Sequence, residues 1–531
     1  MAMEVTLRRS RWWLWYAVVL AAVTSLPYVS AYASEGQAWR FTGFVFGVED
    51  GNSYIAKMLL GTFGQWLFRT PYTTAAQRGV VAFLPYLLLG KLASGTALHE
   101  QLVAMFHLAR VLAIPLVVWA TDRFLRPIIP TESWRRWAVI LATAGGGLGW
   151  LLVLLGRTDW LGNLPLDLYS PESFGFLAIY GLPHLAVARA LLLWGLGEYL
   201  SSPGTTRGAW RAGFAWLAMG FFQPLSVVSA FAVLAVHLAS LSAIAWRNRN
   251  WQAASQWGAR AARAALLASP ILLYNLITFS SDPFLQAWTE QNRILSPHPW
   301  HYLVAYGLLL VPAVLGGRVV LQERQPERML VLAWSVALPI LAYAPHNLQR
   351  RFPEGIWVAI VALAAIGLER VAQRANLGRW VPPAILVPAL LSPALLLAGG
   401  LQVSLHPGLP AFRPTAEVAA FEWLLTNASP GDVVLASYAT SNALPAWAPM
   451  RVVVGHGPES VGLEELRPAV EAFFEPMAEA DRTDFLRIHQ VSYILRGPEE
   501  RRLGLWSPQT SERFHRVYES QGYEIYAIDI G

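Results

Sequence analysis

Long apolar stretches alternate with short polar connectors over residues 11–401 of this chain. An α-helix needs about 20 mostly apolar residues to cross the roughly 30 Å of hydrocarbon in a bilayer, and the run at 381–400 has this character. Twelve segments are predicted as membrane helices on this pattern: 11–33, 80–96, 101–121, 137–156, 182–200, 211–222, 224–245, 264–280, 300–320, 329–345, 355–369 and 381–401. The pattern predicts a polytopic α-helical membrane protein.

The pattern changes after residue 401, where charge rises and short strand-like and helix-like runs alternate. Helices are predicted at 417–427, 463–478 and 480–489, and strands at 433–437, 451–455, 491–497 and 523–529. Strands that alternate with helices are typical of an α/β layer with a mostly parallel sheet. We therefore expect a transmembrane domain over 1–401 and a soluble α/β domain over 402–531.

Composition supports the membrane assignment. Of the 531 residues, 55% are hydrophobic and only 14% are charged, whereas a soluble globular protein carries about 25% charged residues. The net charge of +6 is spread over the connectors, so it does not indicate a nucleic-acid partner. The chain has no cysteine, which excludes disulfides and thiolate metal sites.

The distribution of arginine predicts the topology, because basic loops favour the cytoplasm. The arginine-rich connectors are 122–136, 203–211, 247–263, 318–328 and 370–379. The connectors between them, and the chain after residue 402, are then outside. Arg8, Arg9 and Arg11 also favour the cytoplasm, although twelve crossings would put both termini on one side. We expect 11 or 13 crossings in the cell inner (plasma) membrane, with an extracytoplasmic C-terminal domain.

The first predicted external loop, 34–79, is long and carries two adjacent acids, Glu49 and Asp50. The stretch that follows, 53–68, predicts a helix lying on the membrane surface, with Tyr54, Met58 and Leu59 on its apolar face. Either the two acids take part in chemistry, or they only stabilise the N-terminus of that helix by capping and charge.

This plan resembles the GT-C superfamily of membrane glycosyltransferases, which includes protein O-mannosyltransferases and bacterial aminoarabinose transferases. The resemblance rests on the long first loop, its segment VEDGNSYIAKML (48–59), the many membrane helices and the C-terminal domain. It implies a hexosyltransferase that moves a sugar from a polyprenyl-phosphate lipid to an extracytoplasmic acceptor of unknown kind. It also implies that Asp50, with Glu49 beside it, acts as general base or metal-binding acid, with a divalent cation as a possible cofactor.

Sugar transfer from a lipid phosphate also needs cations that hold the leaving phosphate, and arginine suits this task because its guanidinium donates paired hydrogen bonds. Arg293, Arg350 and Arg351 lie in connectors predicted to be outside. They are predicted to bind the lipid phosphate, although contact with ordinary headgroups is the alternative. His184, at the outer end of a helix, is either a ligand contact or an interfacial histidine.

Other polar residues are less specific. Asp159, Asp167 and Glu172 either join Asp50 around a divalent ion or are ordinary loop acids. The glycine-rich segment 144–150 lies inside an apolar run, which favours close helix packing over phosphate binding. His456 and Glu459 follow a predicted strand, where binding sites are common, but no catalytic partner is evident from the sequence.

Two main function classes follow. The first is a lipid-linked sugar transferase, favoured by the acidic first loop and the external domain. The second is a transporter or flippase, in which the same acids and arginines form a pathway for solutes or lipids. A non-catalytic assembly or receptor protein is a third possibility.

Overall fold

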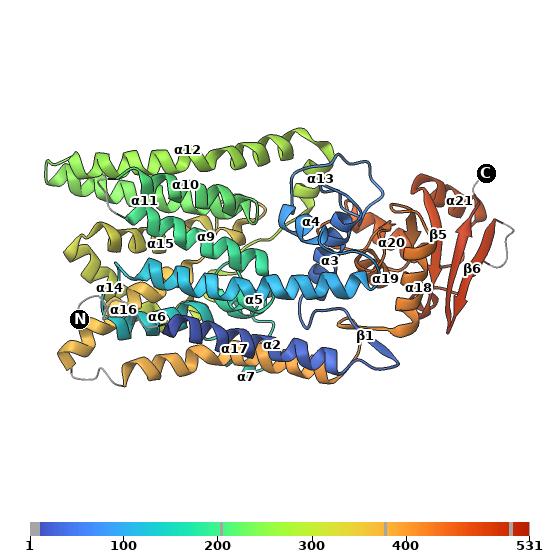
Figure 1. Cartoon of the computed structure of the whole chain (residues 1–531), viewed down its shortest axis with the longest axis horizontal. Helices are drawn as coiled ribbons and strands as arrows, with labels where there is room; N and C mark the ends of the chain where they lie inside the picture. Colours follow the sequence, from blue (N-terminus) through green and yellow to red (C-terminus); the bar gives the residue numbers. More distant parts are fainter. Residues whose placement is uncertain (1–10, 202–204, 376–379, 509–512, 530–531) are drawn as a thin grey trace. The chain divides into compact units, whose positions relative to one another are not determined.

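The computed structural model describes residues 11–201, 205–375, 380–508 and 513–529 (Figure 1). Arg8, Arg9 and the connector residues 376–379 lie outside these ranges. The chain divides into two compact units. The helical unit comprises Met1–Leu26, Leu108–Leu276 and Ile294–Gly399, and the α/β unit comprises Pro27–His107, Ile277–Arg293 and Gly400–Gly531.

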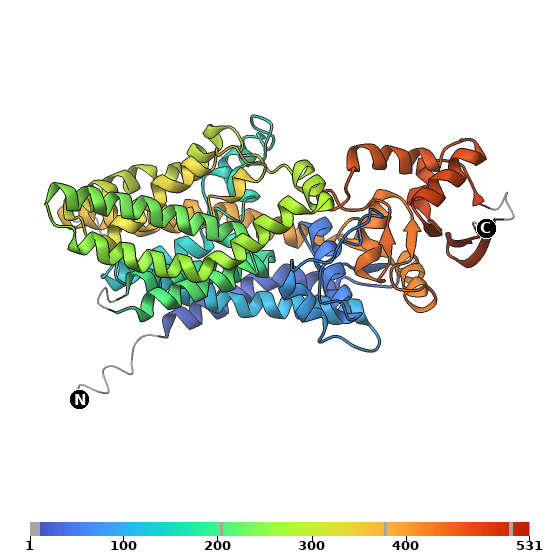
Figure 2. The same ribbon diagram turned by 90° about the horizontal axis from the view of Figure 1, so that it is seen from above.

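Long apolar helices make up most of the helical unit, and Figures 1 and 2 show them side by side as a bundle. Among the described residues, seven helices are long and apolar enough to cross a membrane. They are α2 (Trp12–Ala33), α5 (Leu98–Leu125), α11 (Pro224–Arg247), α12 (Gln252–Ser281), α14 (Pro299–Glu323), α16 (Ile356–Ala375) and α17 (Val381–Leu405). Shorter elements of the unit are α6 (Glu132–Ala144), α7 (Gly149–Leu154), η1 (Leu166–Leu168), α8 (Gly175–Gly181), α9 (Pro183–Leu200), α10 (Arg207–Gly220), α15 (Pro326–Leu341) and η2 (Gln349–Arg351). The total of 11 or 13 crossings stays a prediction.

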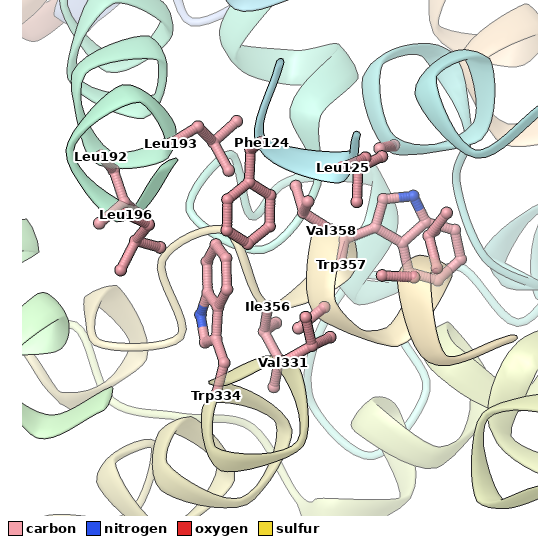
Figure 3. Close-up of a cluster of buried hydrophobic side chains, with 14 of the residues drawn as sticks. Phe124, Leu125, Leu192, Leu193, Leu196, Val331, Trp334, Ile356, Trp357 and Val358 are labelled. Atoms are coloured by element: carbon pink, nitrogen blue, oxygen red, sulfur yellow. The ribbon is translucent and has the colours of Figure 1, made fainter. Parts of the chain in front are cut away.

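Phe124, Trp334 and Trp357 lie in a cluster of buried hydrophobic side chains in the helical unit (Figure 3). The rings of Phe124 and Trp334 meet nearly edge to face, with centroids 5.9 Å apart. The buried indole of Trp357 donates its N–H to the carbonyl oxygen of Leu141 at 2.8 Å. A satisfied N–H lets tryptophan contribute its large apolar surface without an unpaired polar group.

The glycine-rich segment interrupts a predicted helix. The expected helix at 137–156 is wrong, because α6 ends at Ala144 and α7 begins at Gly149. In the break, the backbone N–H groups of Gly147 and Gly149 donate to the Asp167 carboxylate at 2.9 and 3.1 Å. A Cβ on Gly149 would lie 1.9 Å from that carboxylate, so only glycine permits the approach. The glycines therefore bind the side chain of a buried aspartate, which helix packing alone did not predict.

The α/β unit contains a five-stranded sheet of order β4-β3-β5-β7-β6. Its strands are β3 (Val433–Leu435), β4 (Arg451–Val452), β5 (Val491–Arg496), β6 (Phe514–Ser520) and β7 (Tyr523–Ile528). β3 pairs in parallel with β4 and β5, whereas β7 is antiparallel to both of its neighbours. The expected mostly parallel sheet is therefore wrong: the sheet is mixed, because β6 and β7 form a hairpin whose first strand was not predicted.

Helices cover both faces of this sheet. Trp423 of α18 (Thr415–Asn427) contacts Tyr493 of β5, whereas Phe473 of α20 (Leu463–Phe473) is buried in a cluster with Ile494. Successive strand residues point to opposite faces, so α18 and α20 lie on opposite sides. The remaining helices of this part are α19 (Tyr438–Ala443), η3 (Leu444–Ala446), α21 (Glu479–Ile488) and α22 (Pro498–Leu503).

Segments from the first loop complete the α/β unit. They are β1 (Trp39–Phe41) and α3 (Val48–Thr62), joined by α4 (Leu84–Gly90), α13 (Pro283–Gln291) and β2 (Phe412–Pro414). The membrane helix predicted at 80–96 is wrong, because α4 has only seven residues there. β1 pairs antiparallel with β2, so the loop and the chain after residue 411 share one ladder. The predicted boundary between 401 and 402 stays a prediction; the α/β unit itself includes these earlier segments.

α3 differs from the surface helix that the sequence predicted. It begins at Val48 and ends at Thr62, and Met58 and Leu59, predicted to lie with Tyr54 on its membrane face, are buried. α3 packs against α4, α19 and η3 within the unit. The surface-helix prediction is wrong, because the apolar face that was assigned to lipid is covered by protein.

Replacing Asp167 with alanine should destabilise the protein. The Asp167 carboxylate accepts hydrogen bonds from Gly147, Gly149 and the Ser392 hydroxyl, and each buried donor left unpaired costs about 1–3 kcal/mol. Thermal unfolding in detergent measures the loss. Asp159→Ala, in an exposed position, is the matched control and should change stability by less than about 0.5 kcal/mol. Equal melting temperatures for the two variants would contradict a structural role for Asp167.

Candidate functional site

Glu49 and Asp50 occupy the first turn of α3. The residue before the helix is Gly47, in the left-handed conformation with φ 56°, and no side chain caps the helix. The two acids therefore do not act as N-cap residues, although their charges still interact favourably with the helix N-terminus. Both side chains are exposed.

Asp50 contacts a buried histidine. Its Oδ1 lies 3.2 Å from His456 Nε2, and the side chains of Asp50 and His456 are 57% and 4% exposed. An ionised carboxylate only accepts hydrogen bonds, so the imidazole is the donor. Asp50 is thus fixed from inside the unit while its carboxylate remains open to solvent.

Glu49 is held by the same part of the chain. Its Oε1 accepts hydrogen bonds from the backbone N–H of Gly457, at 2.8 Å, and from the Tyr438 hydroxyl. Burial and the nearby Glu49 raise the pKa of Tyr438, so its phenol stays protonated and can donate. Residues 438–457 therefore orient both acids of the first loop.

A buried carboxylate lies behind His456. Glu459 Oε1 is 3.5 Å from His456 Nδ1, and Glu459 accepts hydrogen bonds from Ser53 and Thr70, each at 2.6 Å, and from Lys57. Burial alone would raise the pKa of Glu459, but the Lys57 ammonium and the other donors outweigh it and lower the pKa. Glu459 is therefore a buried anion.

Lys57 neutralises this anion. Its side chain is 1% exposed, and its ammonium lies 4.3 Å from the centroid of the Phe83 ring. A buried charge is costly unless it is paired and hydrogen-bonded, and Lys57 meets both conditions through Glu459 and Ser53. Asp50, His456, Glu459 and Lys57 thus form one continuous series of contacts.

The predicted phosphate-binding arginines fall in both units. Arg350 and Arg351 end η2 in the helical unit, where Arg350 lies 4.5 Å over the Tyr169 ring and Arg351 lies 3.7 Å from the Glu172 carboxylate. His184 is half-buried near the start of α9 in the same unit. Arg293 is exposed after α13 in the α/β unit. Their roles stay predictions.

The loop acids that were considered as metal ligands have different surroundings. The Asp167 carboxylate is occupied by the glycine-rich segment, and Asp159 is exposed. Over the described ranges, no group of three or more histidine, aspartate or glutamate side chains could hold a metal ion. The possible divalent cation stays a prediction.

The partners of the two acids are not evident from the sequence. His456 and Glu459 follow a predicted strand, but nothing in the sequence connects them with residue 50, and Lys57 and Tyr438 were not predicted to belong to the site. One signal was present: Lys57 is one of only two lysines in the chain, the other being Lys91, and it sits in an apolar stretch.

Comparisons with solved structures identify the architecture. The oligosaccharyltransferase AglB of Archaeoglobus fulgidus, solved with an inhibitory peptide and a dolichol-phosphate, superposes with a TM-score of 0.52 at 14% identity, covering 98% of this chain and 75% of AglB. The mycobacterial arabinofuranosyltransferase AftD gives 0.58 at 16% identity, covering 96% of this chain and 40% of AftD. ArnT of Cupriavidus metallidurans in its apo state gives 0.53 at 12% identity, covering 97% of each chain. No protein-family model and no curated protein matches the sequence.

This chain has the GT-C fold. The resemblance inferred from the first loop and the helix pattern is confirmed for the architecture, including the multi-pass helical part and the C-terminal sheet domain. At 12–16% identity the GT-C fold is what these comparisons establish. The two acids of this chain lie, as the sequence suggested, in the loop after the first helix of the fold.

Breaking the Lys57–Glu459 pair should destabilise the protein. Removing one partner of a buried ion pair typically costs about 3–5 kcal/mol, whereas replacing both costs much less than the sum. We expect Lys57→Met and Glu459→Gln each to lower the melting temperature, and the double variant to be more stable than additivity predicts.

The same pair predicts a pH dependence. The pKa of Glu459 is lowered from 4.5 in the folded state, so its contribution is complete above pH 4.5 and is lost as the pH falls through the folded value. The melting temperatures of the wild type and of Glu459→Gln should therefore become equal as the pH falls below 4.5. A difference in melting temperature that stays constant down to strongly acidic pH would show that Glu459 is not a stabilising anion.

Proposed function

We propose that this protein is an integral membrane glycosyltransferase that moves a sugar from a polyprenyl-phosphate lipid to an extracytoplasmic acceptor, with Asp50 as general base. One observation carries the proposal. Asp50 presents an exposed carboxylate that a buried histidine fixes in place, within a chain that has the GT-C fold. A carboxylate that only stabilised a helix would not need such a partner.

The chemistry requires one proton acceptor. The acceptor hydroxyl gives its proton to the Asp50 carboxylate while its oxygen bonds to the anomeric carbon of the sugar. The bond from that carbon to the phosphate oxygen breaks, and the phosphate leaves on its lipid. General base catalysis of this kind contributes about 10²–10⁴ in rate. Glu49, held by Tyr438 and Gly457, supports the orientation of the neighbouring acid.

Two findings favour a lipid-phosphate donor. AglB, which shares the fold, was solved with a dolichol-phosphate. In addition, Arg350 and Arg351 are consecutive cations in a connector that is predicted to lie outside. We propose that these two arginines bind the lipid phosphate, and that the C-terminal domain and the reaction lie outside the inner membrane. The GT-C fold favours this function over the transporter or flippase alternative.

Asp50→Asn should abolish most transfer without unfolding the protein. The amide keeps the shape of the side chain but cannot take the proton, so the rate should fall by about 10²–10⁴. Transfer of labelled sugar from a polyprenyl-phosphate donor by the purified protein measures this loss, and the melting temperature reports the fold. Asp484→Asn is the matched control, since Asp484 is an exposed acid of α21 that pairs with Arg487. Full activity of a folded Asp50→Asn protein would end the general-base assignment.

Replacing both Arg350 and Arg351 with glutamine should weaken donor binding. Loss of two guanidinium groups removes charge-assisted hydrogen bonds to a phosphate. Affinity for polyprenyl phosphate in detergent micelles should fall by at least about tenfold. Arg318→Gln/Arg324→Gln, on a connector predicted to be cytoplasmic, is the control. Unchanged lipid affinity in the Arg350/Arg351 variant would exclude these residues from the phosphate site.

A further inference from the structure

His456 differs from the other buried histidines described in the structure. His99, His237 and His301 each place a ring nitrogen within 3.0 Å of a backbone carbonyl oxygen, from Ala446, Pro326 and Trp160. Such a bond gives one ring nitrogen of a buried imidazole a partner. His456 instead faces two carboxylates, with Asp50 Oδ1 3.2 Å from Nε2 and Glu459 Oε1 3.5 Å from Nδ1. This arrangement matches a group that orients a carboxylate, not one that only fills space.

The loop that carries His456 is itself tightly held. The hydroxyl of Ser460 accepts the backbone N–H groups of Gly455 and His456, at 3.0 and 3.1 Å, and donates to the carbonyl oxygen of Tyr72 at 2.8 Å. The Tyr72 ring lies 5.3 Å from the imidazole. The position of the imidazole is therefore set by the backbone and by packing, before any substrate binds.

We propose that His456 is the positioning residue for Asp50 in the transfer reaction, with the Glu459 carboxylate, which Lys57 neutralises, lying behind the imidazole. The proposal rests on the proposed function of Asp50. A residue after β4, about 400 positions from the first loop, would then set the geometry of the general base. His456 touches neither donor nor acceptor in this scheme; it acts through the Asp50 carboxylate.

The charges around His456 explain how it would act. Asp50 faces it from α3, Glu459 from its own loop, and Tyr72 from the segment after α3, while Lys57 of α3 neutralises Glu459. An N–H donor at Asp50 Oδ1 favours the ionised carboxylate and fixes its plane. Removal of the imidazole therefore removes a donor that holds the carboxylate in place.

The test compares two substitutions at one position. In His456→Ala no donor remains, so kcat should fall by about 10–100-fold, and the acid limb of the pH profile of kcat/KM should move up by about one pH unit. KM for the polyprenyl-phosphate donor should change little. His456→Gln places an amide N–H near the position of Nε2, so it should recover most of kcat and return the acid limb toward the wild type.

His515→Ala is the matched control, because His515 is an exposed histidine on β6. It should leave both kcat and the pH profile unchanged, and melting temperatures identify any variant that fails to fold. If folded His456→Ala keeps the wild-type kcat and acid limb while Asp50→Asn is inactive, the positioning role is wrong and the general base stands. If Asp50→Asn is fully active, the proposed function itself fails.

Discussion

Lys57 and Glu459 are separated by 402 positions in the chain, yet they form an ion pair that is almost completely buried. Such a pair tolerates little displacement, because a buried charge without its partner is strongly unfavourable. The pair ties α3 to the loop after β4. Other contacts depend on the same placement of α3 against this loop. Ser53 and Thr70 donate hydrogen bonds to Glu459, and His456 lies against Glu459.

The geometry of the two exposed acids follows from this buried pair. Once α3 and the loop after β4 are in register, Asp50 meets the His456 imidazole, and Glu49 meets the Gly457 N–H and the Tyr438 hydroxyl. The outer carboxylates are therefore held by a pre-arranged polar layer rather than by their own helix. Pre-organised groups of this kind cost no rearrangement during a reaction.

The helical unit also buries an acidic side chain, and hydrogen bonds from backbone N–H groups and a hydroxyl stabilise it there. The Asp167 carboxylate is buried, and it accepts hydrogen bonds from two backbone N–H groups and from the Ser392 hydroxyl. Glycine at 147 and 149 makes the approach possible, since side chains there would collide with Ala305 or with Asp167 itself. The GT-C fold is retained at 12–16% identity to the solved structures, which agrees with lipid constraining helix length and backbone pairing more than residue identity.

The sequence by itself determined the membrane class, the extents of helices such as α11 and α17, the change of character after residue 401, and the position of Glu49 and Asp50 in the first loop. These features follow from local composition and periodicity, which need no knowledge of distant contacts. Only the tertiary structure decided that α3 is buried, that the sheet is mixed, and that His456, Glu459 and Lys57 stand behind Asp50. The physical reason is that the same pattern of apolar residues results whether lipid or protein covers a helix face. In addition, a contact between side chains 402 positions apart produces no periodic pattern in the sequence.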